Sequence, residues 1–511
     1  MKSTQETVNY QQEIDQLKAK VATLSHQLDW FKRQLFGTKS EKQLIDNPGQ
    51  AGLFSSEKFV EPSPASIDVK PHKRKSNKKL NGDEVNDTGL RFDETVPTKI
   101  IDVQAPELQG LDADQYETIG YKETTRLAQQ PGSYTVLVYR RPIVRHKTQQ
   151  TLNTPEAPSN VLEGCYADVS LIAGLMVDKG IYHLPLYRQH QRMLDSGITI
   201  SRATLINWMH KGIALLKPIY QAQLKSIIDS AVLAMDEVPM KAGRKSKGKM
   251  NKSYFWPMFG DKNEIAFTWS KSRGFIHAKN QLEGFKGTLL TDGYSAYTKT
   301  VKVLNKEEEN VTHATCWAHT RRYFEHSLAI EPVQAQAALD CIAKLYQIEK
   351  HCREELADKE QMVKKRQTDS EPIVTEFFKW VYEQRQRTDL LPSNPLTKAL
   401  NYASNRQAEL KVFLANPDVA IDTNHIERAL RVIPMGRKNY LFCWSELGAE
   451  QLGILQSLLV TCRLQGINPY AYLVDVLQRV SLHPVSKVEE LTPRIWKEKF
   501  MDKKLSSDLA E

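Results

Sequence analysis

The chain has 511 residues, of which 41% are hydrophobic and 26% are charged, and its formal net charge is +9. A chain of this length is too long for one hydrophobic core, so we expect about three or four domains. The composition excludes several classes: six scattered cysteines without a CxxC pair predict no disulfide framework, and no apolar run reaches the about 18 residues of a membrane span. The N-terminus also lacks the apolar stretch of a signal peptide. We therefore expect a soluble, cytoplasmic protein, whose positive charge favours a polyanionic partner.

Apolar residues recur at alternating spacings of four and three within residues 1–45. This spacing is typical of the seam of a coiled coil, and Phe36-Gly37 is a usual helix end. We predict an N-terminal coiled coil that makes a homo-oligomer, with a single amphipathic helix packed on its own domain as the alternative. The residues of the seam are Tyr10, Ile14, Leu17, Val21, Leu24, Leu28, Phe31 and Leu35.

Residues 46–90 lack this periodicity and are predicted to be a flexible basic linker. The segment KPHKRKSNKK, residues 70–79, holds six Lys or Arg and no acid. Such a run is either solvated or in contact with a phosphate backbone. In residues 91–158, the alternation in TVLVYRRPIVRHK predicts a small domain of short strands.

Residues 159–228 are predicted to be helical, with two helical segments joined near Gly197. Ser201 is a natural N-cap for the second segment, which we expect to run from Ala203 to His210. The pattern is similar to a helix-turn-helix, and an ordinary helical hairpin is the alternative. The residues placed to meet DNA would be Ser201, Arg202, Thr204 and Asn207.

The next part of the chain turns to strands. We expect strands in SAVLAMDEV, KSYFWPMFG, EIAFTWS, GTLLTDGYSAY and VTHATCWAH. Two of these apolar runs end in an aspartate, Asp236 and Asp292, so neighbouring strands of one sheet would present two carboxylates side by side. Glu237 should face away from Asp236 if its strand continues.

A third acid stands in IDTNHIERALRVIPMGRKNYLF. Thr423 or Asn424 is expected to cap a helix that Pro434 stops. Glu427 and Arg431 lie one turn apart and can both reach the edge of a cleft. The inward face of the helix would be Ile426, Leu430 and Ile433. Of the rival acids Glu237, Asp422 and Glu446, Asp422 suits a cap better than a metal ligand.

Converging carboxylates repel one another, and a divalent cation removes that penalty. Mg²⁺ or Mn²⁺ takes oxygen ligands, and two such ions roughly 4 Å apart serve an in-line displacement at phosphorus. Basic residues suited to phosphate surround the acids, including those of a predicted loop over residues 240–253. The basic residues of that loop are Lys241, Arg244, Lys245, Lys247, Lys249 and Lys252. The residues predicted to contact DNA are Arg202, Asn207, Lys245, Lys247, His319, Arg321, Arg322, Arg428, Arg431, Arg437 and Lys438.

These stretches resemble the transposases of the insertion-sequence-66 family, which belongs to the DDE superfamily. The matching segments are LFGTKSEK (35–42), MDEVPM (235–240), TDGYSAY (291–297), CWAHTRRYF (316–324), DTNHIERALRVIPMGRKNYLF (422–442) and INPYAYLVDVL (467–477). The resemblance implies a multidomain α/β protein with a mixed-sheet, ribonuclease-H-like core. Its catalytic and metal-binding triad would be Asp236, Asp292 and Glu427. The implied reaction is metal-dependent cleavage at the element's terminal inverted repeats, followed by transfer of the 3′-hydroxyl into target DNA.

The resemblance also implies a large α-helical insertion before the glutamate helix, where residues 337–361 have a helical pattern. It further implies small accessory proteins of the same element as partners. We place the first part of the core at 229–325, the insertion at 326–416, the second part of the core at 417–480 and a C-terminal tail at 481–511.

The chain departs from the family pattern in two places, a zinc-binding module and the cap of the glutamate helix. Many members carry a cysteine-rich zinc module ahead of the core, but here the first cysteine is Cys165. We therefore interpret residues 91–158 as a zinc-free relic of that module. Cys316 and His319 form half of a zinc site without a second pair, so no zinc is predicted there either. His319 should instead touch DNA or a ligand carboxylate. DTN replaces the usual DNN before Glu427.

Two other functions remain open at this stage. One is an inactive descendant that binds DNA without cutting it, and the other is a ribonuclease-H-like nuclease or resolvase. The N-terminal third favours the transposase, which would be associated with the nucleoid when bound to DNA.

Overall fold

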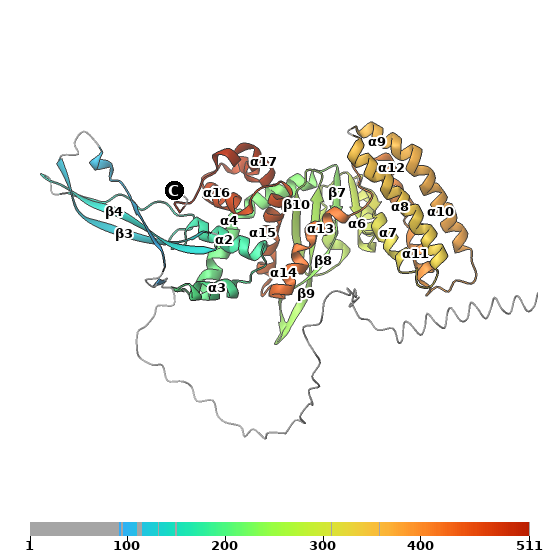
Figure 1. Ribbon diagram of the computed structural model, residues 1–511, viewed down its shortest axis with the longest axis horizontal. Coiled ribbons are helices and arrows are strands. Elements are labelled where there is room, and N and C mark those ends of the chain that lie inside the picture. The colour runs from blue at the N-terminus through green and yellow to red at the C-terminus, as the bar shows by residue number, and fades with distance from the viewer. Residues whose placement is uncertain are drawn as a thin grey trace, which may run out of the picture. The chain divides into compact units, whose positions relative to one another are not determined.

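The structure is a computed structural model that describes residues 91–92, 96–109, 115–130, 132–148, 151–307, 309–356 and 358–509 (Figure 1). The predicted coiled coil and basic linker lie outside these residues and stay predictions. The chain divides into residues 1–86 and 87–511, and only the second unit is described below. Among its helices, none has the length and apolar character needed to cross a bilayer.

A small β-sheet forms early in the described chain, as its alternation predicts. Its strands are β2 (Thr98–Asp102), β3 (Tyr116–Gln130), β4 (Ser133–His146) and β5 (Leu152–Asn153), with a short helix η1 (Pro106–Leu108) before β3. The prediction of short strands is wrong, because β3 has 15 residues and β4 has 14. The order is β2-β4-β3, with β5 paired to β4. β3 and β4 form a long antiparallel hairpin whose turn contains Gly132 at φ +90°, a conformation that glycine adopts without strain.

Three helices follow instead of the two segments predicted. They are α2 (Val169–Gly180), α3 (Leu186–Asp195) and α4 (Arg202–Ile228), and the short strands β1 (Arg91–Phe92) and β6 (Ile198–Thr199) pair with each other. The hydroxyl of Ser201 accepts a hydrogen bond from the Thr204 amide, so the predicted N-cap is confirmed. The predicted end at His210 is wrong, because buried residues continue at helical spacing to Ile227. Gly212 lets α4 approach α2, since a Cβ there would lie 2.5 Å from Cε of Met176.

The central sheet contains the five predicted strands and one more. They are β7 (Val232–Met235), β8 (Val238–Ser246), β9 (Lys249–Gly260), β10 (Ile265–Ser270), β11 (Thr288–Thr291) and β12 (Thr312–Thr315). The order is β10-β9-β7-β11-β12, with β8 paired to β9. β11 is parallel to both β7 and β12, whereas the pairs of β9 are antiparallel.

The loop predicted over residues 240–253 is wrong, because this segment forms the hairpin of β8 and β9. Val238, Met240 and Ala242 are buried and alternate with exposed Pro239 and Lys241, which is the alternation of a strand with one face covered. The many exposed lysines obscured this pattern in the sequence.

Helices flank the sheet and carry the third acid. They are α5 (Phe275–Gln281), α6 (Ser295–Lys306), α7 (Trp317–Glu325), α13 (Asn424–Leu430), α14 (Val432–Tyr440) and α15 (Glu446–Leu464). Ile426 and Ile433 are fully buried, as the predicted inward face requires. The prediction that Pro434 stops the helix is wrong: the helix breaks after Leu430, and Pro434 lies in the first turn of α14. Proline has no N–H to offer the carbonyl four residues earlier, which is that of Leu430.

A helical segment lies between α7 and α13 in the chain. Its helices are α8 (Pro332–Glu355), α9 (Lys359–Lys365), α10 (Glu371–Arg385), α11 (Pro395–Ser404) and α12 (Gln407–Ala415), with a π-helical turn η3 (Arg366–Ser370) before α10. The predicted helical stretch 337–361 falls in α8 and α9. Trp317 of α7 packs against Phe377 and Phe413, with ring centroids 5.4 and 6.4 Å away, so this segment shares a core with the sheet.

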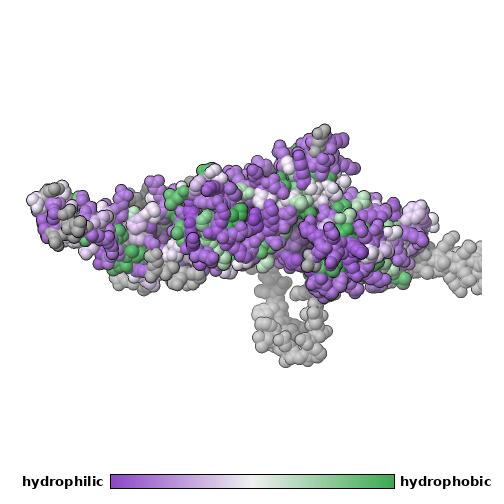
Figure 2. All heavy atoms as spheres, turned by 90° about the horizontal axis from the view of Figure 1, so that it is seen from above, coloured by the Kyte–Doolittle hydropathy of each residue, from purple (hydrophilic) through white to green (hydrophobic). Residues whose placement is uncertain are grey.

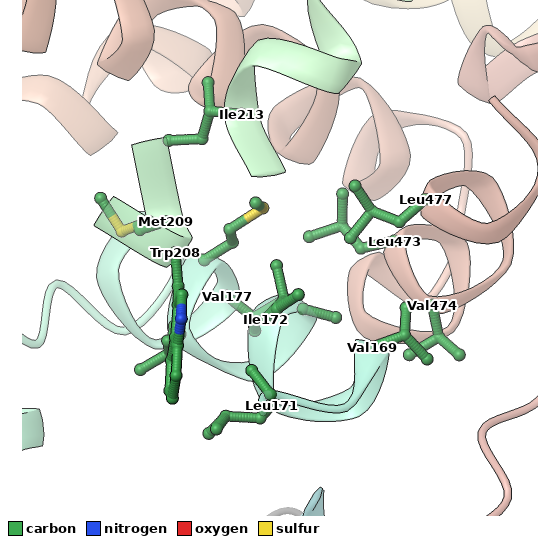
Figure 3. Close-up of a cluster of buried hydrophobic side chains, with 14 of the residues drawn as sticks. Val169, Leu171, Ile172, Val177, Trp208, Met209, Ile213, Leu473, Val474 and Leu477 are labelled. Carbon is green, nitrogen blue, oxygen red and sulfur yellow. The ribbon is translucent and has the colours of Figure 1, made fainter. Parts of the chain in front are cut away.

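A second core joins α2, α4, α15 and the last helices. These are α16 (Pro469–Arg479), η4 (Val485–Leu491), α17 (Pro493–Lys499) and η5 (Met501–Lys503). Figure 3 shows apolar side chains of α2, α4 and α16 facing one another, among them Ile172, Trp208 and Leu473. Helix α15 contacts α2 and α4 as well as β10, so it links this core to the central sheet.

Candidate active site

Two aspartates follow the ends of neighbouring parallel strands. β7 ends at Met235 and β11 at Thr291, and Ala234 is paired with Leu290. Asp236 and Asp292 therefore stand at the same edge of the sheet. The backbone holds both, because the Asp236 amide donates to the carbonyl of Pro257 at 3.3 Å and the Tyr294 amide donates to Oδ1 of Asp292 at 2.8 Å.

Glu237 joins these two aspartates, contrary to the sequence expectation. Asp236, Glu237 and Asp292 each offer one carboxylate oxygen, and the three oxygens lie within 4.8 Å of one another. The expectation rested on the alternation of side chains along a strand. β7 ends at Met235 and β8 begins at Val238, but both pair with β9 in one unbroken register, so alternation alone does not keep the two carboxylates apart.

Hydrogen bonds fix the position of Glu237, whose side chain is only 2% exposed. Its Oε2 accepts from the hydroxyl of Tyr297 at 2.5 Å, and its Oε1 accepts from Nε of Arg273 at 2.6 Å. The Arg273 guanidinium lies 3.9 Å from the ring centroid of Tyr294. The TDGYSAY segment thus supplies Asp292 and two tyrosines to one network. The sequence pattern placed Glu237 outside the site and gave no role to Arg273 and Tyr297, although the adjacent acids at a strand end were a usable signal.

Glu427 reaches the site from α13. Its Oε1 lies 3.7 Å from Nε2 of His319, and its Oε2 lies 3.7 Å from a terminal guanidinium nitrogen of Arg322. Oε1 is buried and has no hydrogen-bond partner among the described residues. Glu427 is not a member of the 4.8 Å cluster, so it stands beside the aspartates and faces two basic side chains. The contact expected between His319 and a carboxylate is present.

Burial and mutual repulsion destabilise the ionised form of the carboxylates in this site. Burial, together with the charges of Glu237, Asp292 and Glu427, raises the pKa of Asp236 to about 8, against a hydrogen bond from the Glu237 amide. Burial lowers the pKa of His319, and the charge of Arg322 adds to this while the neighbouring carboxylates oppose it. A cation placed among the acids would relieve the repulsion that these shifts record.

The rival acids have other partners. Oδ1 of Asp422 accepts from the Asn424 amide at 3.0 Å, which is the capping role expected of it. Thr423 occupies the N-cap position of α13 but makes no capping hydrogen bond through its side chain. Glu446 pairs with Lys271 at 2.9 Å. Cys316 is buried, and its sulfur accepts from the Thr423 amide.

Basic side chains lie on several elements around the acids. All six Lys and Arg of the β8–β9 hairpin are exposed, and the Arg437 guanidinium on α14 donates to the carbonyl of Pro239 on β8. The structure places His319 and Arg322 at Glu427, and Arg202 and Asn207 on the exposed side of α4. The other exposed residues predicted to meet DNA are Lys245, Lys247, Arg321, Arg428, Arg431 and Lys438.

A further basic hollow, missed in the sequence, lies next to Asp292. It has a volume of about 360 Å³ and is lined by three basic residues, one acid and polar residues: Lys299, Lys302, Arg406, Glu409, Ser295, Thr298 and Asn405. Arg406 donates to the carbonyl of Gly293 at 2.6 Å. A Cβ on Gly293 would lie 2.3 Å from Nε of Arg406, which explains the glycine that follows Asp292.

Comparison with known protein families identifies the family of this chain. Residues 164–451, which contain the acids, the flanking helices and the helical segment, match the family described as Transposase IS66 family. This chain belongs to that family. Elsewhere in this IS66 transposase, residues 457–494 match the IS66 C-terminal element, and residues 23–82 match the family described as Transposase C of IS166 homeodomain.

Relatives of this IS66 transposase occur in Sinorhizobium fredii (strain NBRC 101917 / NGR234). The uncharacterized protein y4qI is 29% identical over 506 residues, covering 94% of this chain and 91% of the relative. The uncharacterized protein y4jD is 27% identical over 503 residues, covering 95% of this chain and 97% of the relative. A third, y4hP, is 27% identical over 403 residues, covering 74% and 71%.

Proposed function

We propose that this transposase cuts DNA at the ends of an insertion sequence and joins the freed 3′-hydroxyl to target DNA. Its core would be ribonuclease-H-like, with divalent metal ions held by Asp236, Asp292 and Glu427. The observation that carries the proposal is the meeting of the first two carboxylates at the ends of parallel strands β7 and β11, with Glu427 beside them.

The residues present fit a divalent cation. The cluster offers only carboxylate oxygens, which are the ligands that Mg²⁺ and Mn²⁺ prefer. Oε1 of Glu427 is buried without a partner, as an oxygen awaiting a ligand would be. Bound in a pair, such ions activate the attacking oxygen and stabilise the leaving oxygen at phosphorus.

The chain's own residues have distinct tasks in this proposal. Asp236 and Asp292 hold the cations, and Glu427 completes the site from α13. Glu237 keeps a fourth carboxylate in place through Tyr297 and Arg273. Within the site, His319 and Arg322 lie where they can bind the phosphate next to the scissile bond.

Several wider parts of the proposal rest on the sequence. Residues 159–228 would bind the terminal inverted repeats through a helix-turn-helix-like surface, residues 1–45 would self-associate, and accessory proteins of the element would assist. The domain boundaries given above belong to the same proposal. The nuclease or resolvase alternative lacks a use for the N-terminal third, and intact acids argue against an inactive descendant.

The test is the variant Glu427→Gln, which keeps the size of the side chain and removes its charge. We expect strand cleavage of DNA carrying the element's own ends to fall by at least about a hundredfold, because a metal ligand is lost. Binding of the same DNA, measured by gel shift in EDTA, should change little. Loss of binding and cleavage together would assign Glu427 a structural role and reject the proposal.

A further inference from the structure

A short apolar segment stands beside the basic hairpin and has no task in the reaction described above. Between α14 and the first turn of α15, Leu441 is 63% exposed, Trp444 is 69% exposed and Leu447 is 57% exposed. These three large apolar side chains stand within seven residues on the otherwise mainly hydrophilic surface that Figure 2 shows. Large exposed apolar groups that gather in one place mark a binding surface.

The backbone of this segment is held in a costly conformation. Leu441 has φ +63° and ψ −47°, which a bulky side chain rarely adopts. Burial of its own side chain does not repay the strain, since Leu441 is exposed. Strain that is kept by surrounding structure at an exposed position points to function.

The surrounding structure that keeps it is strand β8. The Cys443 amide donates to the carbonyl of Lys241 at 2.9 Å, and the Gly243 amide donates to the carbonyl of Cys443 at 3.2 Å. Ala242 and Cys443 are both buried at this bridge. The ring centroids of Phe442 and Trp444 lie 5.9 Å apart, so two aromatic side chains are presented together on a fixed turn.

Charge identifies the class of partner. Residues 238–253 and 432–447 carry eight Lys or Arg and one acid, Glu446, which pairs with Lys271. A second copy of the chain would bring the same positive surface against this one, whereas a nucleic acid brings the opposite charge.

We propose that Trp444, with Phe442 and Leu441, stacks on unpaired bases of the DNA bound at the active site. The inference rests on the proposed function. β8 leaves the acidic cluster directly, and Lys241 is five residues from Asp236, which is about 16 Å along a strand. That length is only a few base steps of DNA, so one bound DNA can reach both the acids and the aromatic turn. Apolar wedges and aromatic platforms serve this purpose in other DNA-binding proteins.

The experiment measures binding of two oligonucleotides in EDTA, where no cleavage occurs. One is fully paired, and the other has the same sequence with unpaired bases at one end. We expect the wild type to bind the forked probe more tightly, and Trp444→Ala to lose on the order of tenfold in affinity for that probe alone. Trp444→Phe should retain most of the preference. Tyr382→Ala, which removes a 65% exposed aromatic ring from α10, is the matched control and should behave as wild type.

Two outcomes would overturn the inference. One is an unchanged fork preference in Trp444→Ala. The other is dissociation of an oligomer by Trp444→Ala in sedimentation with both DNA affinities intact, which would make a second copy the occupant. Failure of the wild type to bind either probe would instead overturn the proposed function, so the two can be told apart.

Discussion

Glu237 shows how much depends on where a strand ends. It is the first acid after Asp236, it is nearly buried, and both of its oxygens accept hydrogen bonds. Oε1 accepts from both Nε and a terminal nitrogen of Arg273, whereas Oε2 accepts only from Tyr297 and keeps a second lone pair. Oε2 of Glu237 therefore has capacity left for a cation or for a water bound to one.

Replacing Glu237 with Gln should weaken Mn²⁺ binding by about 10- to 100-fold, as expected when a supporting carboxylate of a metal site is lost. Isothermal titration of the DNA-free protein measures this directly. Glu446→Gln is the matched control, because Glu446 pairs with Lys271, two residues before Arg273, and lies outside the cluster. Equal Mn²⁺ affinities in the two variants would remove Glu237 from the site.

His313 on β12 gives a prediction for pH. Its Nε2 lies 2.9 Å from the hydroxyl of Thr291, and burial, helped by the charge of Arg406, lowers the pKa of His313 to about 4. The unfolded chain has its histidine pKa near about 6.5, so between about pH 6.5 and pH 4 it binds more protons than the folded chain does. The folded state therefore loses stability as pH falls through this window, and loses no more from this group below it.

The expected loss is about 3 kcal/mol for the full shift. Thermal unfolding of the wild type and of His313→Asn from pH 7 to pH 4 should show a smaller decline in the variant. The comparison is needed because other buried histidines also have lowered pKa values, among them His183 and His425. Parallel declines in both proteins would contradict the assignment.

Much of the site was predictable residue by residue, because its acids end apolar runs or sit on a patterned helix. The contact of His319 with a carboxylate was foreseen as well. Glu237 was not, because strand alternation predicts that its side chain faces away from Asp236. Tyr297 and Arg273 were not either, since only the fold brings Arg273, which precedes α5, against the acid after β7.

The β8–β9 hairpin is the element whose charge can be tested most directly. Lys245 and Lys247 lie at its tip, fully solvent-facing and without an acidic partner among the described residues. Changing both to Glu should weaken DNA binding and reduce the slope of log affinity against log salt by about two, one for each phosphate contact.

A matched double variant, Lys379→Glu with Lys398→Glu, makes the same charge change on exposed positions of α10 and α11. Fluorescence anisotropy over a range of salt gives both slopes. If the two double variants weaken binding alike, the effect belongs to net charge and not to the hairpin.

The strands that were predicted best are those in which every residue is buried. β7 and β11 are buried along their whole length, so they are continuous apolar runs in the sequence, as parallel strands are. β8 was missed because most of its exposed positions are basic and only a few of its residues are buried. The helix was predicted to end at Pro434 but breaks at Arg431. Proline has no N–H for the carbonyl four residues before it, so the helix loses its hydrogen bond at Leu430.

At the scale of the whole molecule, assembly would depend on the predicted coiled coil. It lies outside the described residues, so its test is deletion of residues 1–38. We expect the deletion to lower the oligomeric state in sedimentation velocity, because the apolar seam is lost. An oligomer of unchanged size would discard the coiled coil.

The sequence did not predict that helix α15 packs between the central sheet and helices α2 and α4. Nearly every residue of α15 from Ala449 to Cys462 is buried, because the helix faces the sheet on one side and α2 and α4 on the other. A fully apolar helix indicates burial but not between which layers. Gln223 of α4 makes this link specific, since its amide donates to the carbonyl of Ile265 and to the hydroxyl of Thr461.

The same helix also closes a border of the sheet. β10 is the last strand on its side, and its Ile265 and Phe267 amides donate to the hydroxyls of Thr461 and Ser457 on α15. The bridge at Ala242 closes β8 in a similar way. Two strand borders that could recruit foreign strands are thereby blocked, so molecules crowded together on one stretch of DNA are protected there from aggregating by sheet extension.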